Sequence, residues 1–462
     1  MIRTARAREI VVAAAVVGAA ALVTAAGGPA PAMAQAAASR SVVVKDLARD
    51  YLAYPDVKGT VQFSNCWGGA RIPLVQQWIK EFNAIYPNIK VENDVSDCPP
   101  LDQKQVAAIA AGAPPSVLMI KSGNLAFFAE QGALQALDEL MQRDRVKPEW
   151  FYPGEFRSRT WQGKTYGLPN VTAGAQHLLF VNTRLLERIG WPAGKPIETW
   201  QDLEALVEPA KKQKLFVMDP VKSAAGLPIH FVLTHANGGR YWNDDLTKVL
   251  WNEPPAVEAA EWLLRFVKMQ AGRYENLALG SNRKELAYPE EWAPEKYVAT
   301  FNGSWFPFML KSKAPQIHYA VYPFPRNTAR PESKGATAST GAWMFSIARG
   351  AKDQEAAWEW IKFTTTSRHA CGFLKAQNRP SPVAQCNEDP DLKGNPFWPV
   401  VTRDLATNVA VPSAPIHPRM VQLWYEMEDA FLFERMSPRE ALDTYARRGQ
   451  ALLDEWNAKR KR

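Results

Sequence analysis

Hydrophobic and polar residues follow two different periods in the first third of the chain. Residues 59–64 and 89–95 alternate as strands, residues 117–120 form a short apolar strand, and apolar side chains recur at helical spacing over residues 72–86. A second helical segment at 106–111 precedes the third strand. Because strands that alternate with helices pair in parallel, this order predicts an open parallel sheet covered by helices.

The stretch from Gly163 to Trp191 combines turn residues with a continuous apolar run. Gly163 lies in a predicted tight turn, and small residues then lead into the apolar residues 178–181, which predict a buried strand. Asn182 is placed to cap the helix that follows, and Gly190 stands just past the end of that helix. We therefore expect a turn, a crossing segment, a strand and a helix in that order.

Helix and strand patterns continue to the end of the chain. Thr199 is predicted to cap a helix that ends near residue 212, and residues 256–271 form an amphipathic helix. Residues 297–301 are a predicted strand, and Asp353 is predicted to cap a helix over residues 354–363. A closing helix is expected to start after Ser437, where a cap, a proline and a capping-box acid follow one another.

The N-terminal residues have the composition of a secretory signal peptide. Three arginines precede an apolar run at residues 10–26, and the small-x-small motif Ala32-Met33-Ala34 follows it. The run is too short and too rich in alanine for a membrane span. Residues 1–34 are therefore predicted to be a cleaved signal peptide, and residues 35–58 a short N-terminal extension. Because Gln35 and not cysteine follows the cleavage site, we expect a soluble periplasmic protein without a lipid anchor.

Length and charge narrow the class of protein further. The chain has 462 residues, and single cores stop growing at about 250–300 residues, so two domains are expected. The net charge of +8 is spread along the chain. The basic run at residues 459–462 is the exception, and it is typical of a solvated tail. We expect no nucleic-acid partner.

The four cysteines of an exported chain favour two disulfides, for which three pairings exist in principle. Cys66 and Cys98 each lie just past a predicted strand, and those two strands are neighbours. Cys371 and Cys386 would close a short local loop. These two pairings are favoured over metal binding, because the chain has no Cys-x-x-Cys and no paired-histidine spacing.

Several motifs, in this order, resemble the extracellular solute-binding proteins of sugar ABC importers, the family of the maltodextrin-binding protein. The motifs are Ala111-Gly112-x-Pro114-Pro115, Lys164-x-Tyr166-Gly167-Leu168-Pro169, Val181-Asn182-x-x-Leu185-Leu186, Thr199-Trp200-x-Asp202-Leu203 and Ala356-Ala357-Trp358-x-Trp360-Ile361-Lys362-Phe363. The resemblance covers roughly residues 59–456.

This resemblance implies an α/β fold of the periplasmic-binding-protein type II-like class, with two lobes that each hold a central open sheet flanked by helices and are joined by a multi-segment hinge. It places residues 59–168 and 323–377 in lobe 1, and residues 169–322 and 378–462 in lobe 2. The chain would cross between lobes within 163–191, again at 317–324 and a third time near 378–382. A captured carbohydrate would pass to inner-membrane ABC permease subunits; we expect a monomer and no cofactor.

Tryptophans are the candidates for stacking on a sugar. A pyranose offers an apolar C–H face to an aromatic ring, and loops after strands line the cleft of such folds. Trp67 and Gly68 follow the first strand, Trp305 resembles the family's sugar-stacking Gly-x-Trp element, and Trp343 and Trp242 are further candidates. Packing under a loop or within the core is the alternative for each ring.

Polar side chains in loops that the fold would direct at the cleft could bind hydroxyl groups, although each could also be an ordinary loop residue. The candidates are Asp97, Ser122, Asn124, Asn170, Thr172, His235, Asn237 and Arg379. Arg379 raises a sharper hypothesis, because a guanidinium in the cleft would suit an acidic or phosphorylated ligand.

Catalytic motifs are missing from the sequence. It has no Gly-x-Ser-x-Gly, no His-Glu-x-x-His, no phosphate-binding glycine loop and no dinucleotide motif. We therefore expect a binding protein and not an enzyme. A secreted glycosidase with a tryptophan-rich cleft and a lectin-like binding module are the alternatives.

Overall fold

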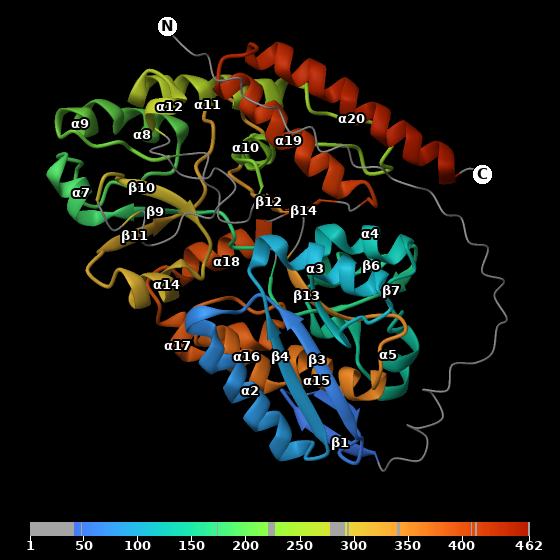
Figure 1. The fold of residues 1–462 in the computed structure, drawn as a ribbon. Coiled ribbons are helices and arrows are strands. Elements are labelled where there is room, and N and C mark those ends of the chain that lie inside the picture. The colour runs from blue at the N-terminus through green and yellow to red at the C-terminus, as the bar shows by residue number, and fades with distance from the viewer. Residues whose placement is uncertain are drawn as a thin grey trace, which may run out of the picture.

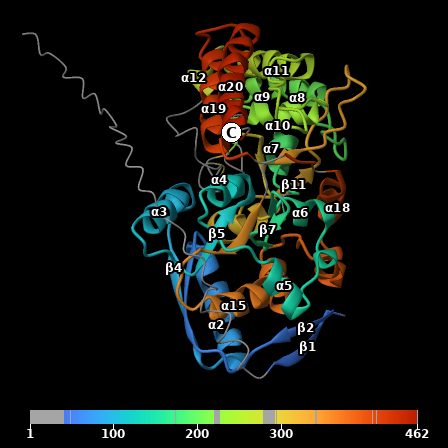
Figure 2. The same ribbon diagram turned by 90° about the vertical axis from the view of Figure 1, so that its right-hand side faces the viewer.

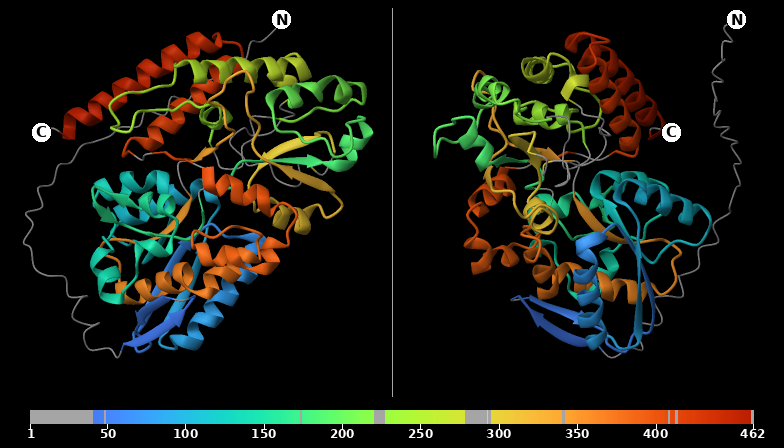
Figure 3. Two further views of the ribbon diagram at one scale, coloured as in Figure 1. Left: turned by 180° about the vertical axis from the view of Figure 1, so that it is seen from behind. Right: turned by 60° about the vertical axis from the view of Figure 1, so that its left-hand side comes forward.

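The computed structural model describes residues 41–47, 49–172, 174–219, 227–277, 292, 295–339, 342–407, 409–411 and 414–460. The predicted signal peptide at residues 1–34 lies outside these residues. Figures 1 and 3 show two bodies, each built around its own sheet, which we call the first and second lobes.

The first lobe contains a five-stranded sheet of order β4-β3-β5-β13-β8. The strands are β3 (Gly59–Asn65), β4 (Ile89–Val95), β5 (Val117–Lys121), β8 (Leu168–Pro169) and β13 (Trp343–Ile347). The pairs β3–β4 and β3–β5 are parallel, as predicted. β13, which the parallel prediction did not include, is antiparallel to β5 and β8. The reason is that β13 returns from the second lobe and enters the sheet from the opposite end.

Helices cover both faces of this sheet and complete the first lobe. They are α2 (Ile72–Ile85), α3 (Cys98–Ala110), α4 (Leu125–Glu130), α5 (Asp138–Asp144), α6 (Pro153–Arg157), α15 (Gln354–Thr366) and α16 (Arg368–Lys375), with a small hairpin of β6 (Thr160–Trp161) and β7 (Lys164–Thr165). Asp353 does not cap α15: its Oδ2 instead accepts a hydrogen bond from the Thr60 amide at 2.9 Å. The predicted cap is therefore wrong, because the side chain turns toward β3.

Residues 41–47 and 49–58 of the predicted extension belong to the first lobe. They form an antiparallel hairpin of β1 (Val42–Asp46) and β2 (Arg49–Ala53) at the end of the lobe far from the second lobe (Figure 2). Tyr51 is buried in the lobe's core, and Asp46 Oδ1 accepts a hydrogen bond from Arg368 Nε at 3.1 Å. The hairpin is therefore attached to α16.

The second lobe contains a three-stranded antiparallel sheet of β10 (Ala299–Asn302), β9 (Leu178–Asn182) and β11 (Tyr319–Tyr322). β9 is wholly buried, as predicted. Asn182 Oδ1 accepts the Leu185 amide at 3.1 Å, and Gly190 has a φ of +76°, so the predicted cap and helix stop are confirmed. Because β11 pairs within this sheet, the predicted second crossing at 317–324 is wrong.

Helices enclose the second sheet and account for most of the second lobe. They are α7 (Thr183–Arg188), α8 (Trp200–Ala205), α9 (Val207–Lys212), α10 (Ile229–Ala236), α11 (Pro254–Ala271), α12 (Tyr274–Leu277), α14 (Phe306–Lys313), α17 (Pro390–Lys393), α18 (Trp398–Thr407), α19 (His417–Leu432) and α20 (Pro438–Arg460). Thr199 and Asp202 form a capping box at α8, and Ser437 Oγ accepts the Glu440 amide. Both predicted caps are thus confirmed. None of the helices in the described ranges is long and apolar enough to span a membrane.

The chain passes between the two cores at three places. The first lies between β8 and β9. The second follows Thr337, where β12 (Ala338–Ser339) pairs in parallel with β14 (Val409–Ala410). The third lies between Cys386, in the first lobe's core, and Leu392, in that of the second, which is later than the predicted 378.

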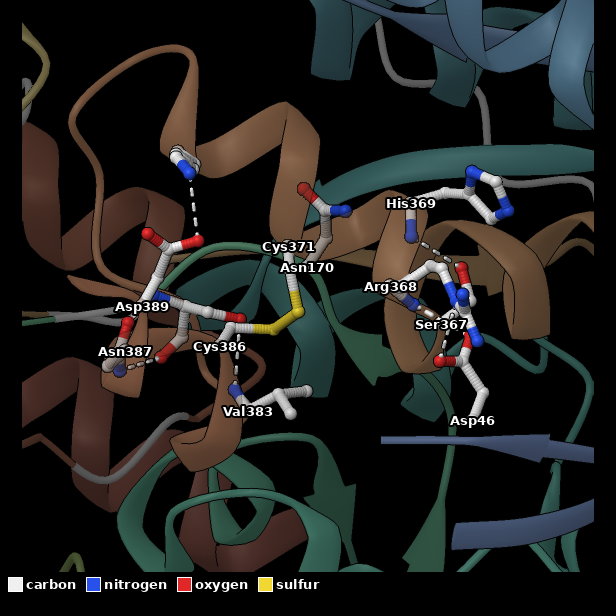
Figure 4. Close-up of a disulfide and its surroundings, with 12 residues drawn as sticks. Asp46, Asn170, Ser367, Arg368, His369, Cys371, Val383, Cys386, Asn387 and Asp389 are labelled. Atoms are coloured by element: carbon white, nitrogen blue, oxygen red, sulfur yellow. Dashed lines mark hydrogen bonds and ion pairs between the residues drawn. A yellow bond between two sulfur atoms is a disulfide. The ribbon is translucent and has the colours of Figure 1, made fainter. Parts of the chain in front are cut away.

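Both favoured disulfides are confirmed. Cys66 is bonded to Cys98, and Cys371 to Cys386. The second bond joins α16 to the short helical turn η4 (Ala384–Glu388) (Figure 4), which explains why the chain stays with the first lobe beyond residue 378.

A buried network of charges ties three parts of the first lobe together. Lys362 Nζ of α15 lies 2.6 Å from Asp144 Oδ2, 2.8 Å from Glu359 Oε1 and 2.7 Å from the Leu52 carbonyl oxygen. The Trp358 indole also donates to Asp144, at 2.7 Å. The side chains of Lys362, Asp144 and Glu359 are fully buried. The network therefore holds the hairpin, α5 and α15 in one arrangement.

Lys362→Met should lower the free energy of unfolding by about 3–5 kcal/mol, because it removes the ion pair of the buried Glu359 and leaves Asp144 with Arg143 alone. Urea unfolding followed by circular dichroism measures the loss. Lys459→Met is the matched control, since its ion pair with Glu455 is exposed, and it should cost less than about 1 kcal/mol. Equal losses in both variants would contradict the role given to the network.

Candidate ligand-binding site

Three of the described contacts between the two lobes involve aromatic rings. The Arg379 guanidinium lies 4.7 Å from the centroid of the Trp305 ring, and that of Arg71 lies 5.9 Å from the Phe308 ring. Trp161 and Trp456 lie with their ring centroids 6.3 Å apart. These contacts mark where the facing surfaces of the two lobes come together.

Trp67 does not lie on the facing surface. The Asn65 side chain accepts the Trp67 amide at 2.9 Å, and the indole turns into the core of the first lobe, where it is 2% exposed. Its ring packs against Phe345 and Phe373, with centroids 5.5 and 4.6 Å away. The prediction of an exposed stacking ring was therefore wrong. Gly68, the next residue, is half-buried.

Trp242 is also a core residue and not an exposed one. Its ring is 2% exposed and lies 5.7 Å from that of Trp424, so its predicted role as a stacking surface is wrong. Trp343 is half-buried at the start of β13, and the Lys121 ammonium lies 5.4 Å from its ring centroid. Of these two candidates, only Trp343 keeps an accessible face.

Trp305 lies where the sequence placed it, at the turn between β10 and α14. A Cβ at Gly303 would lie 2.2 Å from a Trp305 ring atom, so only glycine fits against this indole. The backbone of Gly303 and the guanidinium of Arg379 leave Trp305 only 9% exposed. The ring therefore sits on the facing surface of the second lobe, and its contact with a sugar stays a prediction.

The predicted polar residues after the strands of the first lobe bond mostly to their own lobe. Ser122 is buried and its Oγ accepts Arg159 Nη1 at 3.2 Å, and Asn124 Nδ2 donates to Asp102 Oδ2 at 2.7 Å. Asp97 is exposed at the start of α3, where its side chain makes no capping bond. Of these three side chains, Asp97 is exposed, Asn124 is half-buried and Ser122 is buried.

Asn170 and Thr172 shape the first crossing. Both are about 1% exposed. Asn170 Nδ2 donates to the Thr364 carbonyl at 2.9 Å, and Thr172 Oγ1 donates to the Gly174 carbonyl at 3.2 Å. Both side chains thus donate to backbone oxygens, which fixes the path of the chain between the lobes.

His235 and Asn237 hold a loop within the second lobe. The His235 ring lies 2.9 Å from the Phe231 carbonyl through Nδ1, and burial lowers the pKa of His235 to about 4. Asn237 donates to Pro255 and Glu258, and accepts from Asn327 at 3.1 Å. His235 and Asn237 therefore stabilise the structure of this loop through hydrogen bonds within the second lobe.

Two charged residues on the facing surface were missed from the sequence. Arg71 Nε donates to Gln377 Oε1 at 2.7 Å just past the end of β3. Lys121 ends β5, and burial lowers its pKa although the carboxylate of Asp102 raises it. A lysine at the end of an otherwise apolar strand was the one pattern that could have pointed to Lys121.

α19 of the second lobe approaches the same place. Burial, and to a smaller extent the charge of Lys121, lowers the pKa of His417 to about 4. An influence of Lys121 on the first residue of α19 means that the two lobes are close together at the end of β5.

A buried carboxylate joins the segments of the hinge. Asp404 of α18 accepts hydrogen bonds from the Ala175 amide, in the first crossing, and from Thr337 Oγ1, just before the second. Burial raises the pKa of Asp404 to about 6, although both hydrogen bonds lower it. One side chain, on a helix that follows the third crossing, thus bonds to the segments of the first and second crossings.

No cofactor or metal arrangement is formed by these residues. Among the described ranges, no group of three or more histidine, cysteine, aspartate or glutamate side chains could hold a metal ion. A cavity of about 270 Å³ lies elsewhere, between α3 and the neighbouring strands β3 and β4, and is lined by Gln62, Glu92 and Gln105 among others. None of the interlobe residues lines it.

Two sheet-centred lobes, three crossings and aromatic and cationic side chains on the facing surfaces are the architecture of a solute-binding protein. A family profile described as bacterial extracellular solute-binding protein matches residues 70–370. The chain belongs to this family.

Two of the related sequences have names that state a sugar ligand. A maltotriose-binding protein of Pyrococcus abyssi is 22% identical over 330 residues, which are 70% of this chain and 67% of the relative. A multiple sugar-binding protein of Streptococcus mutans is 23% identical over 338 residues, 70% of this chain and 74% of the relative. An uncharacterised ABC transporter extracellular-binding protein of Pyrococcus horikoshii is 27% identical over 266 residues; the match covers 54% of this chain and 58% of that relative.

Solved structures share the fold. CpMnBP1 with mannotriose bound has a TM-score of 0.74 at 18% identity, covering 85% of this chain and 100% of that chain. The maltose/maltodextrin-binding domain of Bdellovibrio bacteriovorus bound to maltotriose has a TM-score of 0.70 at 15% identity, covering 86% and 100%. The GacH receptor of Streptomyces glaucescens has a TM-score of 0.72 at 17% identity, covering 87% and 100%.

The raised pKa of Asp404 predicts a pH effect on the hinge. The folded protein holds this proton more tightly than the unfolded chain, so the contribution to stability is full below about pH 4 and declines as the pH rises through about 6. Asp404→Asn abolishes the titration. Between pH 5 and pH 8 the difference in unfolding free energy should move in favour of the variant by about 1 kcal/mol.

Chemical denaturation of both proteins at each pH measures this difference. Asp454→Asn serves as the control, because it removes an exposed carboxylate of α20. A pH-independent difference for Asp404→Asn, or the same change for the control, would show that Asp404 does not titrate as a buried hinge group.

Proposed function

We propose that this protein captures a carbohydrate, of oligosaccharide length, between its two lobes and delivers it to the permease of an ABC importer. The observation that carries the proposal is the meeting of Trp305 and Arg379 across the lobes, beside Arg71 and Phe308. Aromatic rings suit the C–H face of a sugar, and guanidinium groups suit its oxygen atoms. The family and the relatives named for maltotriose and multiple sugars support this choice of ligand.

Capture requires the lobes to close. Only a closed arrangement lets residues of both lobes contact one ligand, so binding favours closure by the difference in contacts between the open and closed states. The three crossings provide the hinge, and Asp404 keeps them together while the lobes move. The ligand is then presented by both lobes at once.

The setting follows from the predicted signal peptide and from the family. The protein would act as a monomer in the periplasm, after cleavage behind residue 34, and would bind inner-membrane permease subunits when closed. The import energy would come from those partner chains, so this chain needs neither cofactor nor catalytic group.

A carbohydrate panel tests the proposal. Ligand at 100 times its Kd should stabilise the folded protein by about 2.7 kcal/mol, which corresponds to a rise in Tm of several degrees for domains of this size. The same ligand should reduce the radius of gyration measured by small-angle X-ray scattering. Chromatography of the recovered sugar should show it unchanged; shortened products would indicate a glycosidase, and no thermal shift with any sugar would refute the proposal.

Trp305→Ala should weaken binding of the best ligand at least tenfold, because stacking and desolvation by an indole contribute about 1–3 kcal/mol. Isothermal titration calorimetry measures the change. Trp191→Ala is the matched control, since Trp191 is a partly exposed indole that contacts Lys195 and lies outside the facing surfaces. Unchanged affinity in Trp305→Ala would remove Trp305 from the site.

A further inference from the structure

Arg379 is a buried cation whose guanidinium has no hydrogen-bond partner among the described residues. It follows α16, where its amide donates to the Leu374 carbonyl at 2.9 Å and fixes the backbone. Its side chain is 6% exposed, and Nε is buried without a partner. The guanidinium lies against the Trp305 ring of the second lobe, 4.7 Å from its centroid.

Other enclosed arginines of this chain have carboxylates beside them. Arg159, fully buried, bonds to Glu155 and to the Val171 carbonyl. Arg143 forms ion pairs with Asp144 and Glu355. The chain therefore supplies an anion to these buried guanidinium groups.

Arg49 is a closer comparison, because its guanidinium also lacks a hydrogen bond. It nevertheless lies near the carboxylate of Asp46, which raises its pKa against the effect of burial. The described charge that acts on Arg379 is instead that of another cation, Arg71. Burial and this repulsion both lower the pKa of Arg379 well below its ordinary value.

A buried charge without a counter-ion is costly, by several kcal/mol per ion even after the protein relaxes. Arginine does not relieve this cost by losing its proton at ordinary pH. An arginine kept in such a place between two lobes is therefore suited to a counter-ion that arrives from outside the chain. Its planar fork matches a carboxylate in a bidentate geometry.

The surroundings add the features of a sugar site to this anion site. Arg71 brings a second positive charge, which Gln377 orients through a hydrogen bond at 2.7 Å. Trp305 and Phe308 bring two aromatic rings from one segment of the second lobe. Cations and rings thus come from opposite lobes and meet in one place.

We propose that the ligand is an acidic carbohydrate, whose carboxylate binds to the Arg379 guanidinium while its sugar ring lies against the aromatic side chains of the second lobe. This inference deepens the proposed function and rests on it. It predicts that a uronate binds more tightly than a neutral sugar of the same size and stereochemistry.

The first test uses the wild-type protein. Calorimetry compares trigalacturonate and triguluronate with maltotriose and mannotriose at low and high salt. A uronate should bind at least tenfold more tightly than any neutral trisaccharide, since a charge-assisted bidentate pair is stronger than a neutral hydrogen bond. Its affinity should also fall with salt. Galactose 1-phosphate, included as a second anionic probe, should bind more weakly than the uronates, and tighter binding would replace the carboxylate by a phosphate and overturn the proposal.

The second test uses Arg379→Gln, which keeps a polar side chain and removes the charge. The variant should lose at least tenfold in uronate affinity while its ligand-free Tm stays equal or rises, because an uncompensated buried charge has been removed. Arg447→Gln, at an exposed position of α20, is the matched control and should change neither quantity. A fall in the ligand-free Tm with unchanged uronate affinity would make Arg379 a structural contact of Trp305 and overturn the proposal.

The two proposals fail in different ways. Tight binding of a neutral oligosaccharide together with weak binding of every uronate leaves the carbohydrate function intact and overturns only the acidic ligand. Failure of all sugars to bind overturns both.

Discussion

The carboxylate of Asp404 holds together the segments on which the geometry of the whole molecule depends. Each lobe has its own sheet and its own core, and Trp161 of the first lobe packs against Trp456 of the second. Their relative position is set where the chain passes between them, and Asp404 bonds to Ala175 and Thr337 at that point. The contact between Arg379 and Trp305 is a consequence, because it exists only while the crossings bring the two surfaces together.

Buried charge is handled in two opposite ways within the chain. Lys362 lies between two carboxylates and a carbonyl oxygen, all inside one lobe, so its charge is compensated whatever the hinge does. Arg379 lies between lobes against an aromatic ring and a like charge. The ion pairs of Lys362 make the first lobe rigid. The charge of Arg379 has no described counter-ion at the place where the lobes meet. The stability of the first lobe and the proposed recognition of the ligand thus depend on different parts of the fold.

Local chemistry was predictable from the sequence, and long-range geometry was not. The Asn182 cap, the Thr199 capping box and the buried strand β9 follow from short patterns, and both cysteine pairings followed from the predicted strands and loop. Trp67 shows the limit: a ring after a strand end can turn outward or inward, and here Phe373, from a helix far along the chain, completes the pocket that buries it. The hairpin of β1 and β2 was missed because α16, to which it bonds, is equally distant in sequence. The contact between Arg379 and Trp305 could not be predicted either, because it depends on where the three crossings end.

The position of β13 in the first sheet also governs the order in which the molecule can be completed. β13 lies between β5 and β8, both of which precede it by a long stretch of chain. The sheet of the first lobe therefore stays incomplete until residues far along the chain have joined it. Such pairing between distant segments makes folding slow, because the entropy of closing a long loop is lost before the contacts form.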